Sequence, residues 1–253
     1  METPPFDPKA GEKSYYAKIG PDGRRHARHK PFSDADCGKY LANLGALLLM
    51  LEPPPRTVLD LGCGSGWTSI FLAKTGYEVC GLDISTDAIA LAQETAAETP
   101  GLRVEFQAGD YEDVQPGRLF DYVLFYDALH HAEDEQAAVS AAYKALKPGG
   151  VLFAFEPGAG HSRNAGARHA VEQFGVHEKD MPPAYIWQLG RRAGFRKKLF
   201  LPAPSDLARC VYRRDYLKDS RTGRLLLEKS WGYLRALTKA ARPSTSGLII
   251  MWK

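Results

Sequence analysis

Along most of this chain, apolar and polar positions follow two alternating patterns, one typical of buried strands and one typical of helices. Residues 57–61 (TVLDL) form a short apolar run rich in β-branched and aliphatic side chains, which predicts a buried strand. Similar runs predict strands over residues 78–83, 103–107, 120–126 and 151–156. Each of these runs is separated from the next by polar turns or by residues with helical spacing.

The helical segments complete the layout. Helical spacing of apolar positions predicts helices over residues 34–51, 67–75, 86–98, 133–146 and 183–193. A tight turn is expected at residues 147–150 (KPGG), and two last strands at 196–201 and 247–252. Strands that alternate with helices at this spacing predict an α/β fold in which helices cover both faces of a mostly parallel sheet.

Three segments depart from this rhythm. Residues 1–33 are rich in Pro, Gly and charge and lack periodicity, so they predict a flexible arm. Tyr15, Tyr16 and the basic residues of this arm could fold over a binding site as a lid, and simple disorder is the alternative. Residues 158–180 and 204–245 read as insertions into a single domain over residues 34–253. Within the second insertion, Leu227, Trp231 and Leu234 predict an amphipathic helix.

Composition places the chain among ordinary globular proteins. It has 253 residues, and its longest apolar stretch, residues 41–51, is too short to span a membrane. No secretory signal is visible at the N-terminus. The four cysteines are scattered and form no C-x-x-C pair, which suggests neither a zinc site nor a disulfide framework: Cys37, Cys63, Cys80 and Cys210. We therefore expect a cytoplasmic protein without a membrane span.

Charge is unevenly distributed along the chain. Residues 191–253 carry 16 Lys and Arg against 4 Asp and Glu, although the whole chain has a formal net charge of only +3. A second basic cluster lies at residues 24–30 (RRHARHK). These segments are either solvated surface or surfaces that face an anionic substrate.

A glycine-rich loop follows the first strand and opens the next helix. Glycines allow the backbone to approach a ligand closely, and the helix N-terminus directs free N–H groups into the same space. Gly62 and Gly64 fit the start of a dinucleotide fingerprint, G-x-G-x-x-G. However, Trp67 is too large for the third glycine position, and the glycine stands one residue earlier, at Gly66. A purely structural glycine turn remains an alternative.

An acidic residue, Asp83, ends the second strand roughly twenty residues after the glycines. At this spacing a carboxylate accepts hydrogen bonds from ribose hydroxyl groups. Asp83 could instead cap the following helix, although Ser85 is the better cap. The sequence therefore predicts a cofactor that contains a nucleoside.

The sequence Asp60-Leu61-Gly62-Cys63-Gly64-Ser65-Gly66 resembles motif I of class I S-adenosylmethionine (SAM)-dependent methyltransferases. The resemblance covers roughly residues 55–203 and the last strand. It implies a seven-stranded, mostly parallel, doubly wound sheet whose last strand is antiparallel. It also implies that SAM is the cofactor, with S-adenosylhomocysteine (SAH) as its product, and that Asp60, Gly62, Cys63 and Gly64 belong to the cofactor site.

The same resemblance assigns the adenine site. In the family, an acidic residue beyond the third strand accepts a hydrogen bond from the adenine amino group, and an aromatic or apolar neighbour packs on the ring. Asp110 and Tyr111 match these roles, next to Gly109, and Ile84 is expected on the opposite face of the ring. An ordinary turn at Gly109-Asp110 is the alternative.

The fourth strand ends in Tyr126 and Asp127, and then in Leu129-His130-His131. Ligands in open α/β sheets bind beyond the strand ends where strand order reverses, so Tyr126 and Asp127 are expected near the sulfonium. The LHH sequence resembles small-molecule methyltransferases of the ubiquinone-biosynthesis type. A hydroxyl acceptor needs a base, and histidine titrates near neutral pH. His131 and His130 are therefore the catalytic candidates, unless one of them caps or packs the next helix.

Two further residues are rival catalytic candidates: Glu156, which ends the fifth strand, and His161 in the first insertion. We expect no metal site, because the acidic residues are mostly assigned to cofactor contacts. The pair most able to hold a cation is Asp127 with Glu156.

The first insertion, with GHSRN followed by EQFGVHEKDMPP, is similar to methyltransferases of bacterial polysaccharide and glycoside pathways. That similarity and the basic flanks lead to the hypothesis of a small or medium-sized acceptor, a sugar hydroxyl with an anionic group. One alternative is RNA methylation, which the ordinary apolar spacing of the basic C-terminal third disfavours. Others are an NAD-dependent oxidoreductase, which Trp67 argues against, and a SAM-binding module without turnover.

Overall fold

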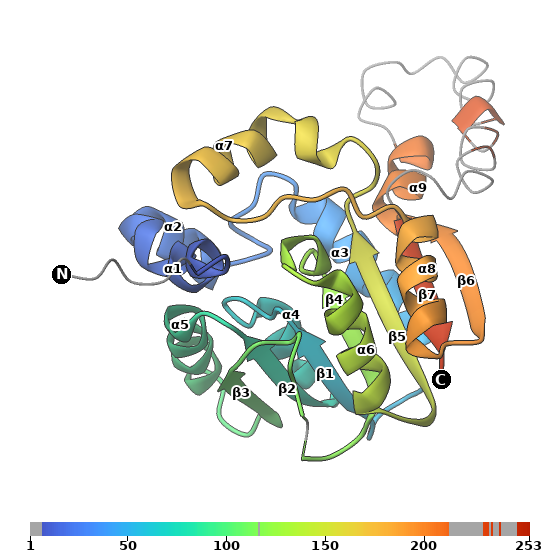
Figure 1. Ribbon diagram of the computed structural model, residues 1–253, viewed down its shortest axis with the longest axis horizontal. Coiled ribbons are helices and arrows are strands. Elements are labelled where there is room, and N and C mark those ends of the chain that lie inside the picture. Colours follow the sequence, from blue (N-terminus) through green and yellow to red (C-terminus); the bar gives the residue numbers. More distant parts are fainter. Residues whose placement is uncertain (1–6, 116, 213–229, 233, 235–237, 239–246) are drawn as a thin grey trace.

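A seven-stranded sheet forms the centre of the molecule (Figure 1). The computed structural model describes residues 7–115, 117–212, 230–232, 234, 238 and 247–253. The strands of the sheet are β1 (Thr57–Leu61), β2 (Glu78–Asp83), β3 (Val104–Ala108), β4 (Phe120–Tyr126), β5 (Leu146–Glu156), β6 (Lys197–Pro202) and β7 (Gly247–Trp252). Their order is β3-β2-β1-β4-β5-β7-β6, so the strand order reverses between β1 and β4.

Strand directions agree with the sequence expectation. Strands β1 to β5 pair in parallel, whereas β7 runs antiparallel to both β5 and β6. The predicted turn at residues 147–150 is built differently, since it lies within β5. The pairing of β4 with β5 jumps from Phe120↔Leu146 to Tyr122↔Val151, so the four turn residues bulge opposite Asp121.

Helices cover both faces of the sheet, as predicted. The helices of this layer structure are α3 (Cys37–Met50), α4 (Trp67–Lys74), α5 (Thr86–Ala97), α6 (Glu135–Ala145) and α8 (Pro183–Ala193). Leucines of α3 and α4, such as Leu44 and Leu72, pack on one face, while Val139 of α6 and Ile186 of α8 pack on the other. The strands are apolar on both sides because both sides are covered.

The N-terminal segment differs from the sequence expectation. Residues 1–33 were predicted to form an arm without regular structure, but they contain two helices, α1 (Ala10–Lys18) and α2 (Gly20–Arg28). Helix α1 has almost no amphipathic character, which explains why periodicity did not reveal it. The two helices lie beside α5 and α7, over the upper edge of the sheet in Figure 1.

The first insertion covers the same edge of the sheet. It contains the short helix η2 (His161–Arg163) and α7 (Ala165–Phe174), close to the single short helix that was expected there. The arm packs tightly against it, because a Cβ atom at Gly11 would lie only 2.0 Å from the Gly175 carbonyl oxygen. Tyr15 also meets Phe174 edge-to-face, with 5.0 Å between the ring centroids. Arm and insertion therefore form one cap.

The second insertion begins with α9 (Pro204–Val211), and most of the rest of residues 204–245 lies outside the described residues. This includes Leu227 of the predicted amphipathic helix. Among the helices that the structure describes, none has both the length and the apolar character that a membrane crossing requires.

Candidate active site

Two adjoining cavities lie under the cap, at the carboxyl ends of the strands. The first has a volume of about 370 Å³ and contains the glycine loop and Asp83. The second has a volume of about 660 Å³ and lies toward α9 and the start of β7. Five residues line both cavities and form their common wall: Lys30, Tyr126, Asp127, His131 and Glu178. A ligand in one cavity can therefore meet a ligand in the other.

The glycine loop, residues 62–66, lies between β1 and α4 and borders the first cavity. Gly64 and Gly66 have φ angles of +52° and +75°, a backbone region that favours glycine. Gly66 also packs so closely that a Cβ atom there would lie 2.7 Å from the Phe106 ring. Gly62, Cys63 and Gly64 all line the cavity, as the sequence predicted.

Asp83 ends β2 beside this loop. Its carboxylate accepts hydrogen bonds from the backbone N–H groups of Gly64 (2.8 Å) and Ser85 (2.9 Å). Burial raises the pKa of Asp83, although these two N–H donors act in the opposite direction. Ser85 caps α5, accepting from the Ala88 N–H, so the cap and the pocket acid are different residues. Asp83 lines the first cavity.

Asp60 has a different position from the one predicted. It is buried beneath the loop, is not among the residues that line the described cavities, and accepts hydrogen bonds from the hydroxyl groups of Thr68 and Ser69 (2.6 Å for Ser69). Burial raises the pKa of Asp60 to about 6, and the two hydroxyl donors oppose this shift. Asp60 thus joins β1 to the first turn of α4 and supports the loop from below.

The expected adenine residues meet in the first cavity, where Ile84, Asp110 and Tyr111 all contribute to the lining. Gly109 does not line the cavity; its N–H donates to the Asp83 carbonyl oxygen (2.9 Å) and fixes this turn beside β2. The Tyr111 hydroxyl donates to the Ala128 carbonyl oxygen (3.1 Å), which places its ring near the glycine loop.

Tyr126 and Asp127 lie where strand order reverses and border both cavities. The Tyr126 hydroxyl accepts from the Asn43 side-chain amide (3.2 Å). Asp127 is the one described non-glycine residue with a positive φ angle, +53°. Its N–H donates to the Phe155 carbonyl oxygen (2.8 Å), which holds this unfavourable conformation in place.

Glu156 and His130 form a buried pair; each is 4 % exposed. The Glu156 carboxylate accepts from the backbone N–H groups of Ala128 (3.0 Å), Leu129 (2.8 Å) and His130 (3.3 Å), and it contacts Nδ1 of the His130 ring (2.8 Å). These four contacts hold Glu156 in place and order the turn after β4, and Glu156 also lines the second cavity. His130 borders the second cavity.

His131 borders both cavities. Its Nδ1 atom lies 2.6 Å from the His177 carbonyl oxygen and 3.5 Å from the Glu12 carboxylate. Burial lowers the pKa of His131, but the Glu12 carboxylate, the Glu178 charge and the carbonyl outweigh burial and raise it to about 9. The carboxylates around this ring favour its protonated form, and Nδ1 is placed to donate to the His177 carbonyl oxygen.

Several cavity residues were not predicted from the sequence. The arm contributes Lys9 and Glu12, and the first insertion contributes Glu178. Tyr15 and Tyr16, which the sequence offered as parts of a lid, line the cavity as well. Lys9 binds the carboxylates of both Asp110 and Glu112 (2.6 Å each). The arm offered no motif that identifies these residues, whereas Glu178 belongs to the HEKD sequence of the insertion.

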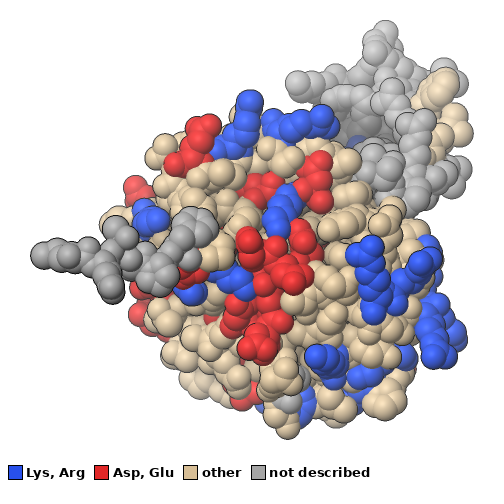
Figure 2. All heavy atoms as spheres, viewed as in Figure 1, with Lys and Arg blue, Asp and Glu red and all other residues tan. Residues whose placement is uncertain are grey.

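Charge in the first cavity differs from the basic character of the C-terminal segment. Six carboxylates and two lysines line the first cavity, and the carboxylates are those of Glu12, Asp83, Asp110, Glu112, Asp127 and Glu178. By contrast, the exposed basic residues 191–192 and 196–198 of α8 and β6 line neither cavity. Figure 2 shows Lys and Arg side chains gathered on that side of the molecule.

Residues 58–150 match a protein-family model described as "Methyltransferase domain". A "Ubiquinone biosynthesis O-methyltransferase" of Idiomarina loihiensis is 39% identical over 101 residues, which are 39% of this chain and 41% of that protein. The protein of the same name from Hydrogenovibrio crunogenus is 30% identical over 153 residues, 55% of this chain and 61% of the relative. The match therefore spans about two fifths to three fifths of the length of these curated relatives.

Solved structures establish the fold. The magnesium protoporphyrin IX methyltransferase of Synechocystis with bound SAH superposes with a TM-score of 0.63 at 18% identity, covering 98% of this chain and 100% of that one. A second neighbour is the phosphoethanolamine N-methyltransferase 2 of Haemonchus contortus in complex with SAM. It superposes with a TM-score of 0.61 at 21% identity, covering 91% of this chain and 56% of that one. The predicted α/β fold is confirmed. These relatives give no support to the polysaccharide branch that residues 158–180 suggested.

The buried carboxyl group of Asp60 leads to a prediction about stability and pH. Because its pKa is raised from 3.8 to about 6, the folded protein holds a proton that the unfolded chain releases between these values. This residue's contribution to the free energy of unfolding therefore falls as pH rises from about 4 to about 6. In Asp60→Asn that fall should be absent. In urea unfolding curves, the free energy of unfolding of the variant should therefore increase relative to that of the wild type as pH rises over this range. Parallel pH profiles for the two proteins would contradict this role.

Proposed function

We propose that this chain, which carries a methyltransferase domain on the class I SAM-dependent methyltransferase fold, transfers a methyl group from SAM to a hydroxyl of a small or medium-sized acceptor. The observation that carries the proposal is the joint position of the glycine loop, Asp83 and Asp110 in one cavity at the reversal of strand order. SAM binds in the first cavity, and the acceptor binds in the second.

The first cavity offers contacts for each part of SAM: the ribose, the adenine, the methionine portion and the sulfonium. Asp83 still has lone pairs free after its two N–H donors, and these can accept the ribose hydroxyl groups. The adenine lies between Ile84 and Tyr111, with Asp110 near its amino group. The methionine portion approaches Gly62 and Gly64, and the sulfonium lies near Tyr126 and Asp127. The excess of carboxylates in the cavity suits a ligand with a positively charged sulfur.

The N-terminal arm acts as a lid in this proposal. Tyr16 covers the glycine loop, since its hydroxyl oxygen accepts from the Ser65 N–H (3.1 Å). Nζ of Lys9 lies 2.6 Å from the Asp110 carboxylate, which is the group that the adenine amino group would contact. SAM therefore enters when the arm withdraws, and the arm then closes over it and limits access of water.

The acceptor meets the methyl group at the common wall of the two cavities. Its oxygen attacks the methyl carbon in line with the C–S bond, whose electrons pass to sulfur and leave SAH. His131 borders both cavities and is the histidine best placed to contact the acceptor. The names of the curated relatives favour O-methylation, and a phenolic hydroxyl is one acceptor class. The sugar hydroxyl remains a hypothesis from the sequence alone.

A first test measures SAH binding by calorimetry. Asp83→Asn should lower the affinity at least tenfold, about 1.4 kcal/mol, because the neutral amide is a weaker acceptor for the ribose hydroxyl groups. Asp87→Asn is the matched control, since Asp87 lies four residues further on and does not line the described cavities. Equal affinities in the two variants, or binding of NAD instead of SAH, would refute the cofactor assignment.

The lid has its own test in the kinetics of cofactor release. Tyr16→Ala removes the aromatic cover over the glycine loop, so SAH should dissociate several-fold faster in a stopped-flow experiment. Tyr212→Ala is a suitable control, because Tyr212 is 80% exposed and lies outside both cavities. If Tyr16→Ala and the control release SAH at the wild-type rate, the arm does not retain the cofactor.

The acceptor class is tested with SAM that carries a labelled methyl group. We expect label to appear on a hydroxyl of a small molecule when phenols, nucleotide sugars, glycolipids and RNA are offered separately. Products are identified by mass spectrometry. Stability in base distinguishes a methyl ether, formed on a hydroxyl, from a methyl ester, formed on a carboxylate. Label on RNA alone would replace this proposal, and SAH binding without any labelled acceptor would favour a binding module.

A further inference from the structure

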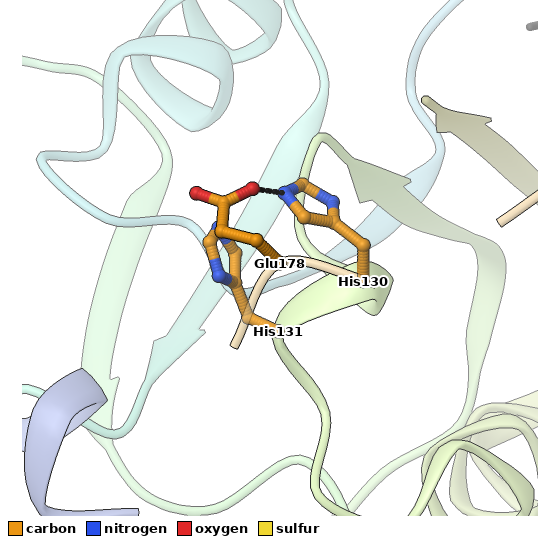
Figure 3. A group of neighbouring side chains, drawn as sticks. All are labelled: His130, His131 and Glu178. Atoms are coloured by element: carbon orange, nitrogen blue, oxygen red, sulfur yellow. Dashed lines mark ion pairs between the residues drawn. The ribbon is translucent and has the colours of Figure 1, made fainter. Parts of the chain in front are cut away.

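Two histidines and a carboxylate come together at the common wall of the cavities (Figure 3). His130 and His131 belong to the short helix η1 (Leu129–His131) that follows β4, and Glu178 belongs to the first insertion. One ligand atom from each of the three lies within 4.8 Å of the other two. In Figure 3 both imidazole rings lie beside the Glu178 carboxylate. The side chains of His130 and Glu178 are only 5% and 12% exposed.

Each histidine has one ring nitrogen already engaged on the side away from Glu178. The Glu156 carboxylate lies 2.8 Å from Nδ1 of His130, and Nε2 of the same ring lies 3.6 Å from a Glu178 oxygen. The His177 carbonyl oxygen, which can only accept, lies 2.6 Å from Nδ1 of His131. Acceptors on both Nδ1 atoms hold the ring protons there, so the lone pairs belong to the Nε2 atoms.

The carboxylate of the cluster is also held from outside. Nε2 of His161 lies 2.6 Å from the Glu178 carboxylate, and the Asn164 side-chain amide lies 3.2 Å from Nδ1 of His161. If the amide donates to Nδ1, the remaining ring proton is on Nε2 and is donated to Glu178. Each of the three residues thus has an outer partner that orients it, the arrangement found around metal ligands in proteins.

We propose that His130, His131 and Glu178 bind one divalent transition-metal ion of the zinc type. Two imidazoles and one carboxylate are a common ligand set for such ions and leave coordination positions open, whereas magnesium prefers oxygen ligands alone. Ligand atoms in a tetrahedral zinc site are about 3.3 Å apart, given bonds of about 2.0–2.2 Å. The ion therefore draws the two rings and the carboxylate closer together.

The charges around the cluster are compatible with a cation. Glu178 is the ligand carboxylate, Glu156 lies behind His130, and Glu12 lies 3.5 Å from Nδ1 of His131. Among the lysines and arginines of the described residues, Lys30 lines both cavities, Lys9 lines the first, and Lys39 and Arg209 line the second. A bound ion replaces ring protons of its histidine ligands, as metal binding generally does. This site differs from the sequence expectation of no metal, in which Asp127 with Glu156 was the pair most able to hold a cation.

The position of the cluster suggests that the ion activates the acceptor hydroxyl, an inference that rests on the proposed methyl transfer. The cluster borders the acceptor cavity, and His131 and Glu178 also border the cofactor cavity. An acceptor hydroxyl bound to the ion has a lower pKa and loses its proton to water. The resulting oxygen attacks the methyl group of SAM, and the C–S electron pair stays on sulfur. The ion thus supplies the activation of the acceptor hydroxyl.

Metal binding can be tested on the full chain without cofactor or acceptor. After treatment with a chelator and its removal, Zn²⁺ should bind with 1:1 stoichiometry in calorimetry. Co²⁺ should give visible absorption bands of a low-coordinate nitrogen and oxygen site. Glu178→Gln and His131→Asn should each weaken Zn²⁺ binding at least tenfold. The matched control is His169→Asn, since His169 is exposed on α7 and lies outside the cluster.

A variant of an outer partner keeps the test independent of folding. His161→Asn retains all three ligands but removes the ring that orients Glu178, so affinity should fall roughly 10–100-fold and the Co²⁺ bands should shift. Far-ultraviolet circular dichroism checks that each variant is folded. The proposal is overturned if the wild type binds no Zn²⁺, or if folded Glu178→Gln and His131→Asn bind it as tightly as His169→Asn.

The experiments distinguish failure of the proposed metal site from failure of the proposed methyl transfer. Zn²⁺ binding that depends on the cluster, without transfer to any acceptor, supports the site and counts against the proposed function. Transfer that continues at the same rate after complete removal of the metal, checked by elemental analysis, overturns the activating role.

Discussion

The Glu156 carboxylate is the contact on which the arrangement of the active site depends. It reaches from the end of β5 to the turn after β4 and binds three consecutive backbone N–H groups and the His130 ring. A buried carboxylate left without such donors would be very unfavourable, so the two strand ends must stay together. This contact fixes η1, and with it the positions of both histidines between the two cavities.

Carboxylates near the ends of three parallel strands have different roles in the site. Asp60 in β1 binds hydroxyl groups of α4 and supports the glycine loop, while Asp83 at the end of β2 binds the loop and also faces the cavity. Glu156 organises the histidine turn. Parallel strands bring these ends to one edge of the sheet, so residues far apart in sequence shape one cleft. The same residue type therefore has supporting and ligand-facing roles, depending on burial.

The cap over this edge completes the site with residues from outside the sheet. Helix α1 and residues 174–178 meet through the close contact at Gly11, and the Glu12 carboxylate accepts from the His177 N–H (2.7 Å). That contact joins the arm to the segment that carries Glu178. The arm is thus linked to the cluster of His130, His131 and Glu178, because the arm residue Glu12 also contacts His131.

The sequence by itself determined the sheet, most helices and the part of the first cavity that the glycine loop, Asp83, Asp110 and Tyr111 line. Strand composition, glycine spacing and the acid at Asp83 are local signals, and the resemblance in motif I extended them to Asp110 and Tyr111. Tertiary structure decided the rest. Only packing revealed that Asp60 and Glu156 are buried supports, that the arm is helical, and that Glu178 joins His130 and His131. These features depend on contacts between residues distant in the chain, and a local pattern of residue types carries no record of such contacts.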